Sequence, residues 1–384
     1  MWRSLLLLLA GILAAVPVVH ACSVSAIMWS IRSVAADGFY RFVRDGMVGY
    51  IDARGKIVVP PTLPRNADFA DREFHEGLLV VPKSERPEVR GALYLDPNGR
   101  AVFQTSFWGN GDFSEGLAPA SPKLDTWGFM DRSGQLAIPP QFVSVGGFSD
   151  GLARVDVSRE ENATGFVDKQ GVLVMKPTLR NARDFHEGRA AAILEGPCRL
   201  MNGGSCAPPE YLPTKRGVDC RWAFIDKTGQ PISTLRFDEA KDFSEGLAPV
   251  RIGKLWGYVD LSGQLAISPQ FEAAEPFSEG LAAVRMAAES RYIMSGFINR
   301  AGRVVIQPKF DFAGSFANGR AVVSRVVGNH YAQRFIDTAG NSAFPGEFAN
   351  ATSFHKGLAL VRIGYRQFAW IDPSGKRVFT YEEK

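Results

Sequence analysis

One pattern recurs along this chain of 384 residues: aromatic, small residue, aromatic, aliphatic, Asp, any two residues, Gly. Its clearest copies run from Trp127 to Gly134 and from Trp256 to Gly263. The glycine recurs at positions 55, 99, 134, 171, 229, 263, 302, 340 and 375. A second signature, Phe-x-x-Gly before an apolar stretch, follows each of the first eight copies. Self-similarity of this kind is typical of stacked supersecondary units, so we predict a tandem array of eight copies and a partial ninth.

The spacings divide each copy into a constant part and a variable part. Fourteen residues separate the first glycine from the Phe in seven of the eight copies. The connection from the second glycine to the next Asp varies from 14 to 38 residues. A rigid unit is therefore joined to the next by one elastic connection, and insertions are expected to collect at one edge of the array.

Each recurrent position of the motif can be explained by β structure. The small residue, such as Gly257, lets a neighbouring backbone approach closely. Asp260 begins a turn, and Gly263 supplies its positive φ. The following strand is expected to end at a proline such as Pro269, which cannot extend a hydrogen-bonded ladder. No window has helical periodicity, so the prediction is an all-β array of three-stranded units, with four strands where the connection is longer.

These motifs resemble the WG-repeat family, which is named for the Trp-Gly dipeptide at the start of each unit. The resemblance covers residues 39–384, although Trp-Gly itself survives only at Trp127 and Trp256. It implies a β-rich array found mainly in bacterial proteins, often exported, with no family-wide catalytic residues. About eight units can stay an open solenoid or close into a propeller-like ring. The half-motif at 39–43 and the partial copy at 368–379 could pair to close a ring, or could cap an open array.

The N-terminus is predicted to be a signal peptide over residues 1–21, followed by a segment over 22–38. Arg3 precedes an apolar run from Leu5 to Val19 that is too short to span a bilayer, and Ala21 precedes Cys22. Cys22 is a candidate lipidation site because its surroundings resemble a lipobox, but His20 and the missing Gly/Ser tether favour simple export. No transmembrane helix is expected in the mature chain. Its net charge of +3, after loss of Arg3 from a total of +4, is too small to indicate nucleic-acid binding.

An insertion at 196–221 interrupts the repeat and holds Cys198, Cys206 and Cys220. Their spacing fits no zinc motif, and clustered cysteines in an exported chain favour a disulfide. Cys198 and Cys220 lie at the neck of the loop and are the candidate pair. The loop is interpreted either as stapled and functionless or as a binding element.

The repeated carboxylates are interpreted as turn residues, because the seventh copy has Asn299 in their place: Asp52, Asp96, Asp131, Asp168, Asp226, Asp260, Asp337 and Asp372. The acidic residue before the second glycine is interpreted as a solvated turn position, since it becomes Lys356 in the last copy. His75, His186 and His355 share one slot and are expected to be exposed. Arg251, Arg285, Arg325 and Arg362 could form a positive stripe that suits an acidic polymer, but solvated strand ends are preferred.

We therefore expect an exported, non-catalytic scaffold that binds protein or polysaccharide at the cell envelope, as a monomer, without cofactor or metal. No zinc spacing, phosphate loop or nucleophile motif is present in the sequence. The first alternative is an enzyme whose site is built from irregular loops, at 196–221 and around His330. The second is a lipid-anchored structural protein of the envelope.

Overall fold

Nine small antiparallel sheets follow one another along the chain. The computed structural model describes residues 37–65, 72–83, 90–159, 164–194, 221–288, 292–327 and 330–383. These residues belong to one compact unit, residues 33–384. Within them the elements are strands and turns, and there is no helix that is long and apolar enough to cross a membrane.

We number the sheets as blades in chain order. Blade 1 holds β1 (Phe39–Arg44), β2 (Met47–Asp52) and β3 (Ile57–Pro64); blade 2 holds β4 (Phe74–His75), β5 (Leu78–Pro82), β6 (Ala92–Leu95) and β7 (Ala101–Gln104); blade 3 holds β8 (Gly109–Asn110), β9 (Ala118–Lys123), β10 (Thr126–Met130) and β11 (Leu136–Phe142). Blade 4 holds β12 (Ser144–Ser149), β13 (Leu152–Asp156), β14 (Thr164–Val167) and β15 (Leu173–Leu179); blade 5 holds β16 (Asn181–Ala182), β17 (Ala190–Ile193) and β18 (Trp222–Ile225); blade 6 holds β19 (Glu239–Ala240), β20 (Leu247–Ile252), β21 (Leu255–Asp260) and β22 (Leu265–Phe271). Blade 7 holds β23 (Ala273–Ala274), β24 (Leu281–Ala287), β25 (Ile293–Asn299) and β26 (Val304–Phe310); blade 8 holds β27 (Phe312–Ala313), β28 (Ala321–Val327) and β29 (His330–Ile336); blade 9 holds β30 (Asn350–Ala351), β31 (Ala359–Gly364), β32 (Gln367–Ile371) and β33 (Arg377–Glu382).

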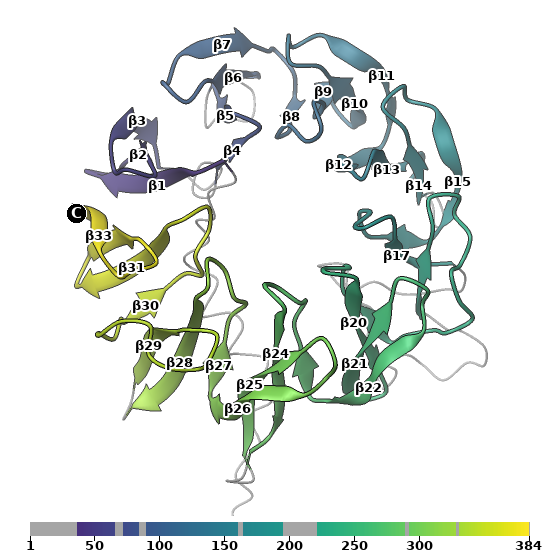
Figure 1. Ribbon diagram of the computed structural model, residues 1–384. Coiled ribbons are helices and arrows are strands. Elements are labelled where there is room, and N and C mark those ends of the chain that lie inside the picture. The colour runs from purple at the N-terminus through teal and green to yellow at the C-terminus, as the bar shows by residue number, and fades with distance from the viewer. Residues whose placement is uncertain are drawn as a thin grey trace, which may run out of the picture. The chain divides into compact units, whose positions relative to one another are not determined.

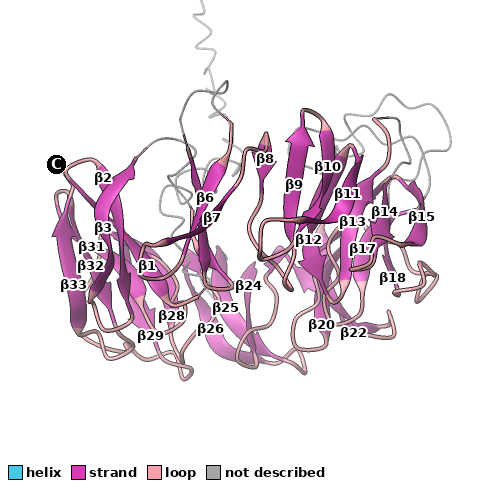
Figure 2. Cartoon of the chain, turned by 90° about the horizontal axis from the view of Figure 1, so that it is seen from above, coloured by secondary structure: helices cyan, strands magenta, loops and turns pink. Residues whose placement is uncertain are grey.

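The blades are arranged in a ring, with β33 of the last blade beside β1 of the first (Figure 1). Turns and loops lie at the two ends of the strands when the ring is seen from the side (Figure 2). The chain is therefore a closed nine-bladed β-propeller, and of the two architectures that the sequence allows the ring is confirmed.

The sequence repeat and the blade are out of phase by half a unit. The strands of a blade pair in chain order. In blade 9, the second half of the eighth copy supplies β30 and β31, and the partial ninth copy supplies β32 and β33. This meander puts the Phe-x-x-Gly and Asp-x-x-Gly turns on one face of the ring, which we call the turn face. The loops between the second and third strands, and the connections between blades, lie on the opposite loop face. The insertion falls between Ile193 and Trp222, which are paired, so it enters and leaves on the loop face.

The Gly of the repeated motif is explained by an irregular outer strand. In blade 6, Trp256 pairs with Phe271 and Tyr258 with Ile267, so the outer strand carries extra residues opposite Gly257. A Cβ at Gly257 would lie 2.4 Å from the backbone oxygen of Ile267. This confirms the predicted close approach of backbone. The expectation that proline ends the strand is wrong: Pro269 lies inside β22, at a bulge on the outermost strand, where a missing N–H costs no ladder bond.

The core lies between neighbouring blades, where the recurrent Phe side chains are buried. Phe277 of the second signature lies 4.9 Å from Tyr258 of the preceding blade, centroid to centroid, and both are fully buried. Phe316 packs against Phe297 in the same way at 4.8 Å. The predicted role of this Phe in filling the core is confirmed. Each blade therefore buries its apolar surface against its neighbours.

The residue before the second glycine joins each blade to the next. Its side-chain oxygen accepts a hydrogen bond from the N–H of the corresponding glycine one blade further on, as Glu245 does from Gly280 at 3.0 Å. The interpretation of this position as a merely solvated turn is therefore wrong. Eight such inter-blade bonds occur: Asp37 with Gly77, Glu76 with Gly116, Glu115 with Gly151, Asp150 with Gly188, Glu187 with Gly246, Glu245 with Gly280, Glu279 with Gly319, and Asn318 with Gly357. All of these acceptor residues except Asp37 adopt positive φ, which aims the side chain along the ring.

The junction between blades 9 and 1 is built differently. Lys356 stands at the acceptor position there, beside Gly38, and a lysine cannot accept a hydrogen bond. Aromatic side chains join the two blades instead. The Tyr40 hydroxyl donates to the backbone oxygen of Lys356 at 2.6 Å, and Trp370 Nε1 donates to that of Arg41 at 2.9 Å. Burial raises the pKa of Tyr40 to about 12, so its hydroxyl stays protonated.

The closing contacts also decide how the two partial motifs meet. Phe42 of β1 packs on Phe379 of β33 with 4.9 Å between ring centroids. The two strands nevertheless belong to different sheets, because β1 pairs with β2 and β33 pairs with β32. The half-motif and the ninth copy therefore close the ring by side-chain packing between blades.

Candidate binding surface

The repeated aspartates cap turns, as the sequence predicts. Asp260 Oδ1 accepts hydrogen bonds from the Ser262 N–H at 2.9 Å, the Ser262 hydroxyl at 2.6 Å and the Gln264 N–H at 3.1 Å. The bond from the Ser262 hydroxyl is the main cause that lowers the pKa of Asp260. Asn299 makes the two backbone bonds at 3.1 and 3.0 Å with no charge. These side chains are engaged with their own turns and leave no cluster for chemistry.

The histidines that share one repeat slot are half-buried between blades, and the expectation of exposed side chains is wrong. His75 Nε2 lies 3.8 Å from Asp112 of the next blade, and His186 Nε2 lies 3.9 Å from Asp242. Burial lowers the pKa of His355, with a further contribution from the charge of Lys356. In four of the other five copies a serine takes the slot and its hydroxyl donates to the backbone of the next blade, as Ser278 donates to Phe316 O at 2.7 Å; the fifth copy has Ala317. The slot therefore serves contact between blades.

The loop face carries exposed apolar side chains in six blades. Tyr365 and Tyr292 are the most exposed, at 80% and 73%, and each lies in the loop between the second and third strands of its blade. The exposed members near these loops are Leu124, Val157, Ile252, Tyr292, Ile293, Val326, Tyr331 and Tyr365. Side chains of this kind, spread over six blades, provide contact area without contributing to the core.

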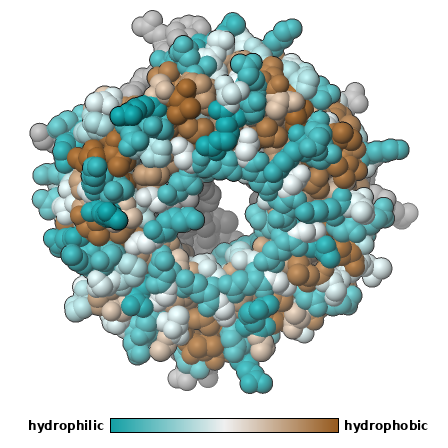
Figure 3. Space-filling view, turned by 45° about the horizontal axis from the view of Figure 1, so that its top comes forward, coloured by the Kyte–Doolittle hydropathy of each residue, from teal (hydrophilic) through white to brown (hydrophobic). Residues whose placement is uncertain are grey.

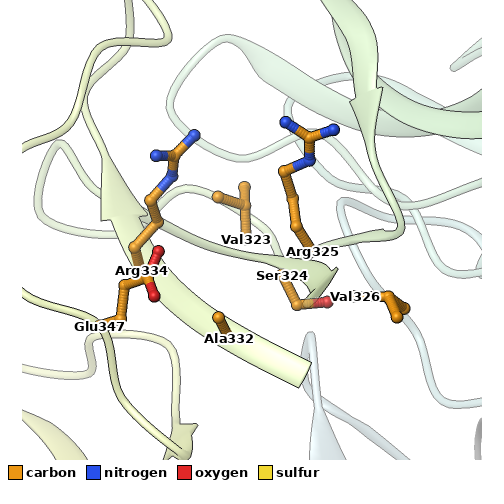
Figure 4. Close-up of a pocket in the computed structure, with 7 residues that line it drawn as sticks. All are labelled: Val323, Ser324, Arg325, Val326, Ala332, Arg334 and Glu347. Carbon is orange, nitrogen blue, oxygen red and sulfur yellow. The ribbon is translucent and has the colours of Figure 1, made fainter. Parts of the chain in front are cut away.

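A pocket of about 200 Å³ opens in blade 8, between the middle strands and the segment that leads to blade 9 (Figure 4). Its lining consists of Val323, Ser324, Arg325, Val326, Ala332, Arg334 and Glu347. Arg325 and Arg334 extend to the same side of the sheet. Among the residues that the structure describes, neither guanidinium forms an ion pair.

A second pocket, of about 250 Å³, follows the innermost strand of blade 5 and contains charges of both signs. Its lining includes Arg154, Arg183, Asp184 and Asp242, and the Arg183 guanidinium lies 5.5 Å from the centre of the Trp222 ring. Hydrophilic side chains predominate around the central opening of the ring (Figure 3). Opposite charges in one pocket balance each other, so this site favours neither anions nor cations.

The proposed positive stripe is divided by local partners. Arg251 is paired with Glu239 at 2.8 Å, and Arg362 donates to the backbone oxygen of Gly364 at 3.2 Å. Arg325 instead faces the pocket with Arg334, a residue that the repeat did not single out. The sequence could have indicated Arg334, because this arginine occupies the position of the small residue in the repeat motif.

Several predicted site residues cannot be placed. Cys22, Cys198, Cys206 and Cys220 lie outside the described residues, as does the insertion from 196 to 220, so the disulfide and lipidation stay predictions. His330 begins β29. Within the described parts of the chain, no three His, Cys, Asp or Glu side chains lie close enough together to hold a metal ion.

The chain belongs to the family of proteins built from the WG containing repeat. The family model matches residues 127–157, 165–196, 222–256, 256–287, 296–325 and 334–366. The resemblance expected from the motifs is therefore confirmed. No curated protein is detectably similar to the chain in sequence.

Solved structures are similar to the chain at low sequence identity. The crystal structure of a eukaryotic initiation factor has a TM-score of 0.60 and 11% identity to this chain, with 90% of this chain and 96% of that chain covered. Dipeptidyl peptidase 4 from Porphyromonas gingivalis has a TM-score of 0.46 and 11% identity, with 94% and 61% covered. BamB from Moraxella catarrhalis has a TM-score of 0.40 and 11% identity, with 79% and 93% covered. From the first of these likenesses we take the propeller fold alone.

Proposed function

We propose that this chain is an exported, non-catalytic binding scaffold at the cell envelope, and that its loop face contacts a protein partner. The observation that carries the proposal is that the two faces of the ring use their side chains differently. The repeated side chains of the turn face bond to their own turns or to the next blade, whereas the loop face exposes tyrosines and aliphatic side chains in six blades. Binding residues are concentrated on loops held by a rigid scaffold.

Tyrosine favours a protein partner over a polysaccharide only where it joins an apolar surface. Tyr292 is next to exposed Ile293, and Tyr331 pairs across the hairpin with exposed Val326. Tyrosine flanked by aliphatic side chains is the composition of protein interfaces. The basic and acidic residues of this face, such as Arg251 with Glu239, then form a polar rim.

A photo-crosslinking amino acid at Tyr365, compared with one at Leu261 on the turn face, tests the proposal. Both side chains are exposed, so each reports on its own face. We expect protease-sensitive adducts from position 365 in envelope extract and none from 261. Adducts that resist protease but yield to glycosidases would identify a polysaccharide. Adducts from 261 alone would refute the loop face as the binding surface.

Export and the enzyme alternative need separate measurements. Mass spectrometry of the mature N-terminus is expected to find a chain that starts at Cys22 without lipid. A diacylglyceryl group on Cys22 would favour the lipid-anchored structural protein. For the enzyme alternative, His330→Ala is expected to leave partner binding unchanged. Catalytic turnover by the native protein that His330→Ala abolishes would support the enzyme and contradict our proposal.

A further inference from the structure

Blade 8 departs from the repeat at a position where five of the other blades have a glycine. Five blades have Gly there, at 49, 128, 165, 257 and 296, and in each a Cβ would lie within 2.3–2.8 Å of a backbone oxygen of the outer strand. The same five blades carry the bulge proline, at 60, 139, 177, 269 and 308. Glycine and the bulged outer strand therefore occur together, because the missing Cβ leaves room for the backbone of the bulge.

Arg334 takes this position in blade 8, and the outer strand is absent there. The segment after β29 forms only the isolated bridges Gln333 with Phe348 and Ile336 with Ser342. The segment from Ser342 to Phe348 lies along the edge of β29 without forming a regular strand, and Arg334 projects into the pocket (Figure 4). Blade 5 also lacks a regular outer strand, but it has the short Ala223 at this position and no cationic side chain.

The second guanidinium is placed by the register of the hairpin. Val323 pairs with Arg334 and Arg325 pairs with Ala332, so the two arginines are diagonal neighbours on one side of the sheet. Like charges at this spacing repel, and no described carboxylate neutralises them by an ion pair. Glu347 lines the pocket and is exposed, without an ion pair to either arginine among the described residues.

We propose that this pocket binds an oxyanion, a carboxylate or phosphate group, carried by a ligand that approaches the loop face. Two planar guanidinium forks offer paired N–H donors that match the oxygens of such a group. Glu347 then acts at the rim, where its negative charge opposes binding of a second anion. Arg251 has no such role, since Glu239 already occupies its guanidinium. The pocket shares Val326 with the apolar side chains of the loop face, but Tyr365, the crosslinking position, does not line it, so the two proposals are tested by separate measurements.

The test measures binding of inorganic phosphate and of glucuronate to the full-length protein by calorimetry, with glucose as the uncharged control. We expect binding of at least one anion and none of glucose. Arg334→Gln and Arg325→Gln should each weaken binding about tenfold or more, the loss of one charge-assisted pair. Arg251→Gln is the matched control and should leave the affinity within about twofold. Phosphate binding without glucuronate binding would assign the site to phosphates, and the reverse to carboxylates.

Glu347→Gln should change the affinity for the anion in the opposite direction to the arginine variants. Removing the rim carboxylate should tighten anion binding about threefold and make it more dependent on salt, because the net positive charge that attracts the anion is larger. Thermal melts show whether each variant is folded. No anion binding by the wild type, or equal losses with Arg251→Gln and Arg334→Gln, would overturn the proposal. Either outcome would leave the crosslinking result at Tyr365 unaffected.

Discussion

The two faces of the ring obey different rules, although the same repeats build both. Side chains such as Glu245 tie each turn of the turn face to the next, and the segment from the first glycine to the Phe, which includes the connection between blades, has a constant length in seven copies. The segment from the second glycine to the next Asp, which includes the loop between the second and third strands, varies from 14 to 38 residues, and these loops expose apolar side chains. A residue that must reach an identical neighbour cannot change its position, whereas a loop that ends in solvent can. Constancy of spacing therefore reports contact between blades.

A second comparison is between the ring-closing junction and the other eight. Repeated carboxylate or amide oxygens hold the ordinary junctions, while Tyr40 and Trp370 hold the closure. Tyrosine hydroxyls also donate to backbone oxygens of the neighbouring blade at internal junctions, as Tyr258 does to that of Glu275 at 2.8 Å. The closing junction therefore differs by Lys356 at the acceptor position and by the bond from Trp370. This difference favours closure after nine blades over continued stacking.

The largest effect is expected from Gly257→Ala in the framework. The new Cβ would lie 2.4 Å from Ile267 O, so the outer strand must shift, at a cost of about 3 kcal/mol in the free energy of unfolding. Denaturant melts measure it. Ala223→Gly, the reverse change in the blade without an outer strand, is the control and should cost about 1 kcal/mol or less. Equal effects would show that the strand contact is not the cause.

Removal of one inter-blade bond should have a smaller effect. Glu245→Ala leaves the Gly280 N–H without its partner and should destabilise by about 1.5 kcal/mol. Glu245→Asn is the rescue variant, because Asn318 makes the same bond to Gly357 at 3.2 Å. Chemical denaturation compares the three proteins. If the Glu245→Ala variant is as stable as the wild type, the interpretation of this position as a solvated turn would be correct.

Asp260 tests the turn itself. Asp260→Ala should cost about 1 kcal/mol, while Asp260→Asn should be nearly neutral, as Asn299 implies. The folded pKa of Asp260 lies below its unfolded value, so its contribution is present above the unfolded pKa of about 3.9 and is lost as pH falls through the folded pKa. Melts between pH 5 and 3 should therefore show a loss of stability that is smaller in Asp260→Asn. Equal losses from Ala and Asn would mean that the charge matters.

The closing junction can be made more like the others. Lys356→Asn introduces an acceptor beside Gly38 and should stabilise the ring by about 0.5 kcal/mol. Thermal melting against Lys356→Ala, which adds no acceptor, isolates the hydrogen bond. A destabilised asparagine variant would indicate that Lys356 has a role of its own at the closure.

The smallest effect is expected on the loop face. Replacing residues 197–219 by a short Gly/Ser link should change the free energy of unfolding by about 0.5 kcal/mol or less, because Ile193 and Trp222 remain paired on either side. Circular dichroism and denaturant melts provide the measurement. An unfolded deletion variant would make the insertion part of the framework and would remove the distinction between the faces.

The sequence by itself determined the β class, the repeat and the turns. Glycines at constant spacing require positive φ, and Gly263 and Gly280 adopt φ of 76° and 79°. Asn299 among the aspartates was enough to assign their role, since a turn needs an acceptor and not a charge. These properties are local, so a few neighbouring residues encode them.

Only the tertiary structure decided the closure, the phase of the blades and the meaning of the second acidic position. Glu245 and Gly280 are 35 residues apart, and their bond exists because two blades stack. The pairing of Arg325 with Arg334 likewise needs the register of a hairpin and the absence of an outer strand. Local spacing carries no information on which copies touch, whereas packing of one blade on the next places these side chains together.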